Sequence, residues 1–197
     1  GWYGLLASRL GDYRGAHERI ARARALEPAS LIARLWEAQV LHVERRFALA
    51  DSVARATMAL DSTFMLAWAW RANALLAMGQ TAQAVALQER HVALLPAGRL
   101  EEAHGMLAYA YARAGRAREA RALLEAMRAR SGGRLPATGA IAAALEELGD
   151  HEAAVALLAE AIARHDVWLV QFPRAERYDK LRMDPRAAAM LARLGTK

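Results

Sequence analysis

Histidines and adjacent glutamates are the residues of this chain that could ligate a metal ion or transfer a proton. Cysteine is absent, which excludes disulfides and thiol chemistry. The six histidines are His17, His42, His91, His104, His151 and His165. None has the H-x-x-x-H or H-E-x-x-H spacing that places two zinc ligands on one helix face. The carboxylates of Glu101-Glu102 and of Glu146-Glu147 are sequence neighbours, so they point to different sides of a helix and form no catalytic pair. We expect no enzymatic activity, no cofactor and no metal site.

Basic residues raise the question of a nucleic-acid partner, because the chain carries a net charge of +6. Net charge alone predicts non-specific association with polyanions rather than a binding site. The stretch Ser131–Arg134 is rich in glycine but lacks the Gly-Lys-Ser/Thr ending of a phosphate loop, which favours a linker. We therefore expect no specific nucleic-acid partner, and a nucleic-acid-binding helical repeat remains the weakest alternative.

Tryptophan recurs at a fixed interval, since Trp2, Trp36 and Trp70 are each 34 residues apart. Tryptophan and tyrosine often anchor interfaces, because they bury a large area with few rotatable bonds. A regular interval also points to repeated structural elements that place each ring in an equivalent position.

The same interval organises most of the chain. The residues at the repeated turn are Gly11, Arg45, Gly79, Gly115 and Gly149, with spacings of 34, 34, 36 and 34. Five residues after each turn stands an alanine: Ala16, Ala50, Ala84, Ala120 and Ala154. Seven residues before each turn stands a small residue: Gly4, Ala38, Ala72, Ala108 and Ala142. Two antiparallel helices approach closely only where small residues face each other, and glycine readily ends a helix in the left-handed conformation. The pattern therefore predicts five hairpins of two helices each. His151 stands where Tyr13 and Phe47 follow other turns, so we expect it to pack against its helix pair.

This pattern resembles the tetratricopeptide repeat, a helix–turn–helix unit of about 34 residues. The resemblance rests on the two small columns, on Gly11 and Tyr13 at a turn, on the ending Ala25–Pro28, and on Trp68 near the start of a first helix. It departs from the family at Arg45, where glycine is usual. It implies an all-α fold, a right-handed α-solenoid. The implied units are 1–30, 31–64, 65–98, 99–134 and 135–167. The first unit begins in mid-helix, so we expect the natural protein to extend further towards the N-terminus.

The segment 168–197 does not continue the repeat. Asp184 followed by Pro185 is a typical helix start, and a helix is predicted from there to about Leu194. A solenoid exposes the apolar face of its last unit, so we expect this segment to be a C-terminal cap. Its ending also resembles the C-termini of bacterial multidomain signalling proteins, in which such repeats follow a Ser/Thr kinase, a nucleotide cyclase or a winged-helix domain. That resemblance implies a domain in the bacterial cytoplasm or on the extracytoplasmic side of a membrane-anchored parent protein. No apolar run reaches the roughly 20 residues of a membrane span, so we expect no membrane insertion.

The resemblance also implies which residues face a binding groove, because the first helices of a tetratricopeptide stack line its concave side. The inward positions carry Trp36, Gln39, His42, Leu66, Trp70, Asn73, Met106, Tyr109 and Arg113. The expected function is a non-catalytic scaffold that holds a protein or peptide segment in this groove, with polar side chains pairing with the ligand backbone.

Two alternatives stay open from the sequence. Trp2, Trp36 and Trp70 either bind a ligand or pack between successive first helices and fix the curvature of the stack. The truncated first unit would also leave an apolar face that a second copy of the chain could cover, which would make this a self-assembly module and a homo-oligomer.

Overall fold

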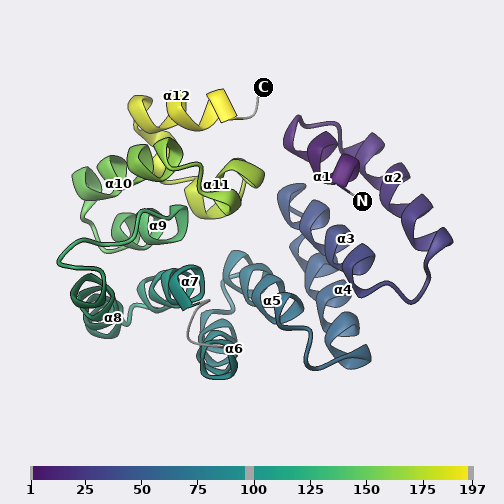
Figure 1. Ribbon diagram of the computed structural model, residues 1–197, viewed down its shortest axis with the longest axis horizontal. Coiled ribbons are helices and arrows are strands. Elements are labelled where there is room, and N and C mark those ends of the chain that lie inside the picture. The colour runs from purple at the N-terminus through teal and green to yellow at the C-terminus, as the bar shows by residue number, and fades with distance from the viewer. Residues whose placement is uncertain (1, 96–99, 195–197) are drawn as a thin grey trace.

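The computed structural model describes residues 2–95 and 100–194, and regular structure in these ranges is helical throughout, as the sequence predicts. The helices follow one another around a central region, and the last ones come round to the side of α1 (Figure 1). Direct contact between α11 and α1 closes this arrangement. The two ends of the described chain therefore lie near one another.

Ten helices pair into five hairpins. These are α1 (Trp2–Arg9) with α2 (Tyr13–Leu26), α3 (Leu31–Val43) with α4 (Phe47–Leu60), α5 (Met65–Ala77) with α6 (Thr81–Leu94), α7 (Leu100–Arg113) with α8 (Ala117–Arg130), and α9 (Gly139–Glu147) with α10 (His151–Ala163). The first helix of each hairpin also contacts the first helix of the next, from α1 through α3, α5 and α7 to α9. The five first helices thus form one continuous inner layer.

The turns between paired helices have the backbone conformation that the sequence predicts. All five turn residues have a positive φ, between 66° and 86°. This includes Arg45, whose side chain must tolerate a conformation that glycine adopts freely. The Arg45 guanidinium donates from Nη1 and Nη2 to the two carboxylate oxygens of Asp179, at 2.7 and 2.8 Å. A long-range ion pair therefore accompanies the departure from glycine.

The two columns of small residues lie at the packed interfaces, which confirms their predicted role. Every alanine of both columns is no more than 1 % exposed. In the first hairpin, a Cβ added to Gly4 would come within 3.0 Å of Ile20. Larger side chains at these positions would push the paired helices apart.

The C-terminal residues form α11 (Val167–Gln171), the short 3₁₀ helices η2 (Glu176–Tyr178) and η3 (Leu181–Met183), and α12 (Pro185–Leu194). The predicted final helix is confirmed as α12, which packs against α10 and η3. The segment does more than cover the last hairpin, however. Residues 172–182, called the inner segment below, run back along the inner layer and contact side chains of α5, α7 and α9 and of the turn that follows α3.

Candidate functional site

The inner layer holds most of the residues expected to line a groove, and the inner segment lies against them. Trp70 of α5 is 3 % exposed. Its ring meets Phe172 of the inner segment edge-to-face at a centroid distance of 4.7 Å, and His42 of α3 at 5.5 Å. Such aromatic contacts contribute beyond the area that they bury. Trp70 therefore packs against the chain itself.

A second contact joins the inner segment to α7. The Arg113 Nη1 donates to Glu176 Oε1 at 2.9 Å, and the Tyr109 hydroxyl donates to the same oxygen at 3.2 Å. Arg113 also donates to the Tyr109 hydroxyl at 3.1 Å. Burial raises the pKa of Tyr109, and the Glu176 carboxylate raises it further, so the phenol stays protonated as a donor. These two sequence-predicted residues thus form one carboxylate-binding cluster.

Two further ion pairs fix the end of the inner segment. Asp179 accepts hydrogen bonds from Arg45 in the turn that follows α3, and Lys180 Nζ lies 2.5 Å from Glu147 Oε2 of α9. Gly139 of α9 gives room to the ring of Tyr178, because an added Cβ would collide with the Tyr178 hydroxyl. Glu176, Asp179 and Lys180 of the inner segment thus each pair with an opposite charge on the repeats.

The two polar residues of α3 that were expected to pair with a ligand are buried. Gln39 and His42 are each 3 % exposed, and Gln39 Oε1 and His42 Nδ1 have no hydrogen-bond partner among the described residues. Burial, with smaller contributions from the charges of Arg177 and Arg45, lowers the pKa of His42 to about 3. His42 is therefore neutral at physiological pH and acts here as an aromatic packing group.

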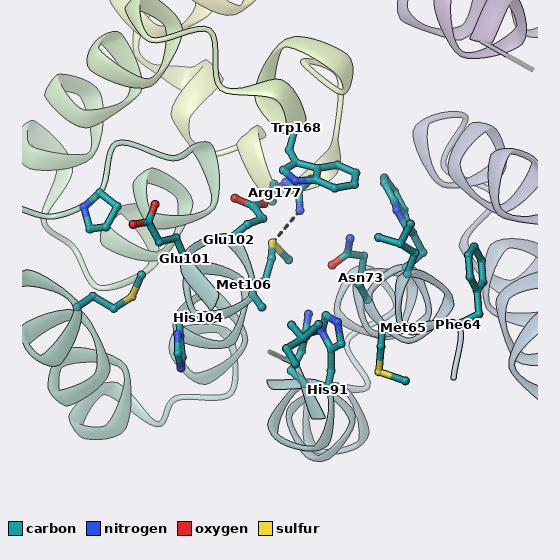
Figure 2. Close-up of a pocket in the computed structure, with 18 of the residues that line it drawn as sticks. Phe64, Met65, Asn73, His91, Glu101, Glu102, His104, Met106, Trp168 and Arg177 are labelled. Atoms are coloured by element: carbon teal, nitrogen blue, oxygen red, sulfur yellow. Dashed lines mark hydrogen bonds between the residues drawn. The ribbon is translucent and has the colours of Figure 1, made fainter. Parts of the chain in front are cut away.

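Beside the inner segment lies a cavity of about 930 Å³, bounded by α5, α6, α7 and α8 (Figure 2). Four of the nine predicted groove residues line it: Leu66, Trp70, Asn73 and Met106. Trp36 lies outside it and is partly buried against the core. The side chain of Trp2 lies outside the described residues. The structure therefore gathers the central part of the predicted groove into one cavity and separates it from α1 and α3.

Trp168, Arg177 and Glu102 also line the cavity and are not among the predicted groove residues. Trp168 and Arg177 come from the C-terminal segment, which the sequence predicts only as a cap, and Glu102 belongs to a pair of adjacent glutamates for which no role is predicted. Arg177 is 7 % exposed and donates from Nη1 to Met106 Sδ at 2.8 Å. No sequence signal distinguishes Arg177 from the other basic residues of the chain.

His151 contacts its own helix pair and also a residue outside it. Its side chain is 40 % exposed, and it joins Glu146 of α9 in its own hairpin to Asp184, which precedes α12. Its Nδ1 lies 2.7 Å from Glu146 and its Nε2 lies 3.0 Å from Asp184 at the start of α12. Hydrogen bonds to Asp184 and then to Glu146 raise the pKa of His151. The departure from Tyr13 and Phe47 therefore serves to join α12 to the last hairpin.

The part of the chain that the structure describes contains no group of three or more His, Asp or Glu side chains placed to hold a metal ion. Among its helices, none combines the length and the apolar character needed to cross a membrane. No known family model matches the sequence, and none of the curated proteins that were compared is similar to it.

Proposed function

We propose that this chain is a tetratricopeptide-type, right-handed α-solenoid that acts as a non-catalytic protein-interaction module of a larger bacterial signalling protein. The repeat interval of about 34 residues, the left-handed turn residues and the buried small columns support the assignment of the repeats. Each feature is what closely packed, stacked helical hairpins require.

The observation that carries the binding function is the path of the inner segment. It is a largely irregular stretch with two short 3₁₀ helices, and it is held by side chains of the first helices and of the turn that follows α3. Trp70 receives an aromatic ring, and Arg113 and Arg45 each receive a carboxylate. A partner segment with one aromatic and two acidic residues at similar spacing would meet the same groups. The inner segment is then the internal competitor of the partner.

A photo-cross-linking residue at Leu66 tests this function in the cells that naturally produce the protein. Leu66 is 36 % exposed at the wall of the cavity, and the more exposed Leu60 at the end of α4 provides the control position. The substitutions Glu176→Gln and Asp179→Asn remove two ionic contacts of the inner segment and leave its shape unchanged. We expect a distinct protein adduct at Leu66, absent at Leu60, and stronger in the doubly substituted chain.

Three results would contradict this function. Equal adducts at both positions would indicate non-specific contact. Adducts made only with further copies of this chain would favour self-assembly instead. A lack of any adduct, even after the inner segment is loosened, would mean that the inner layer serves packing alone.

A further inference from the structure

Two groups of opposite charge, the buried Arg177 and the partly buried Glu102, meet the cavity without forming an ion pair. Arg177 belongs to the inner segment, and Glu102 belongs to α7. The Arg177 guanidinium contacts Met106 Sδ and lies over the Tyr178 ring at 5.5 Å, but its Nε has no partner, and no described carboxylate forms an ion pair with it. Sulfur is a weak acceptor. The cation therefore lacks the anionic partner that buried arginines usually have.

Glu102 shows the complementary deficit. Its Oε2 is buried without a hydrogen-bond donor, and no cation of the described chain forms an ion pair with it. Burial raises the pKa of Glu102 to about 7, although the charge of Arg177 acts in the opposite direction. The two groups thus lie close enough to influence one another and too far apart to pair. A gap of this kind suits a ligand that carries both charges.

A third polar group and the apolar walls define the rest of the ligand. Asn73 Oδ1 is also buried without a donor. Figure 2 shows Asn73, Glu102 and Arg177 around one side of the cavity, with the indole of Trp168 beside them. Trp70 forms part of the same wall. One anion-binding group, two groups that accept hydrogen bonds and a pair of indoles thus converge from α5, α7, α11 and η2.

We propose that this cavity binds a small zwitterionic amino acid with an apolar side chain. Its carboxylate pairs with Arg177, its ammonium donates to Glu102 and Asn73 Oδ1, and its side chain packs against Trp70 and Trp168. An α-amino acid carries its two charged groups on the same carbon atom, which matches two opposite groups that face the same gap. The volume of about 930 Å³ lies within the usual range for small-molecule sites. This proposal does not rest on the proposed protein-binding function: the cavity can bind an amino acid even if the chain binds no protein partner.

The site also spans two parts of the fold. Arg177 moves with the inner segment, whereas Glu102 and Asn73 belong to the repeat helices. A bound amino acid therefore connects the inner segment to the inner layer and holds it in place. Mass action then makes the docked form of the segment more stable as the amino acid concentration rises.

Calorimetric titration with L-phenylalanine and L-leucine at millimolar concentration tests the proposal on the whole chain. N-acetyl-L-phenylalanine lacks the cation and L-phenylalaninamide lacks the anion, so each removes one charged contact from the same side chain. We expect both amino acids to bind, and each blocked analogue to bind at least about tenfold more weakly than phenylalanine. Absence of binding by both amino acids, or equal binding by the blocked analogues, would overturn the proposal.

Substitutions identify the site. Glu102→Gln keeps the shape of the side chain and removes its charge, and Ala69→Phe fills the cavity from its half-buried α5 wall without touching either charge. Both variants should lose binding by at least about tenfold, while Glu125→Gln on the exposed face of α8 should bind as the unaltered chain does. Arg177→Met is an additional variant, to be used if its circular dichroism shows native helicity. Binding that survives both Glu102→Gln and Ala69→Phe would place the ligand elsewhere and refute this site.

Discussion

The docking of the inner segment predicts a large loss of stability when its aromatic anchor is truncated. Phe172 is 2 % exposed and packs edge-to-face on Trp70 at 4.7 Å and stacked against Trp168 at 6.2 Å. Phe172→Ala removes a buried ring from a position where α5, α11 and the inner segment meet. The vacated space cannot close without moving α5, because Trp70 is itself held by His42.

Truncation of a buried phenylalanine costs about 3–5 kcal/mol in the free energy of unfolding. For a chain of this size, such a loss corresponds to a fall in melting temperature of roughly 10 °C. Part of the loss belongs to the contact between the two rings. A double-mutant cycle of Phe172→Ala and Trp70→Ala should therefore give a coupling energy of about 0.5–1.5 kcal/mol.

Urea unfolding followed by circular dichroism measures these values, with Leu60→Ala as the control. Leu60 is 60 % exposed, so its truncation should change the free energy of unfolding by no more than about 0.5 kcal/mol. The reasoning is refuted if Phe172→Ala is as mild as Leu60→Ala, or if the cycle gives no coupling. Either result would mean that the inner segment does not rest on α5 in solution.

Three further predictions concern the hairpins and their closure. Hydrogen bonds to Asp184 and Glu146 raise the folded-state pKa of His151, so its stabilising effect is complete below about pH 6.5 and is lost as the pH rises through that folded pKa. The difference in melting temperature between the unaltered chain and the His151→Asn variant should therefore shrink from pH 5.5 to about pH 8. Arg45→Ala loses the ion pair with Asp179 and keeps the backbone strain of a positive φ, whereas Arg45→Gly loses the same ion pair but relieves that strain. Urea unfolding should therefore find the glycine variant more stable than the alanine variant by about 1 kcal/mol, and the reverse order would contradict the strain. Ala108→Leu overpacks a fully buried helix contact and should cost about 1–3 kcal/mol in the same assay, and an unchanged midpoint would show that α7 and α8 are loosely packed.

Arg45 departs from the glycine of the other four turns, and the three-dimensional structure shows the contact that accompanies this departure. The repeat marks this position as a turn, and the φ of 66° confirms it. The reason for an arginine there is the carboxylate of Asp179, which is 134 residues away along the chain. A local pattern predicts the conformation of such a residue but does not contain its partner.

The residues of the cavity likewise divide into those predictable from the repeat and those contributed by a distant part of the chain. The inward positions of Trp70, Asn73 and Met106 were implied by the resemblance to the tetratricopeptide repeat. Whether that face would be open depended on the C-terminal segment. Arg177 and Trp168 complete the cavity from a part of the chain that does not follow the repeat.

The amino-acid sequence by itself determined the helices, the turns and the close pairing within each hairpin. These features depend on contacts between residues less than about one repeat apart, where the spacing of small residues and turn residues leaves few arrangements. The tertiary structure was needed to show that residues 172–182 of the same chain lie against much of the inner layer and leave a cavity beside it. That arrangement depends on ion pairs and aromatic contacts between residues 33 to 134 positions apart. With 27 basic and 21 acidic residues, charge alone permits many pairings, and the shape of the closed arrangement of helices selects among them.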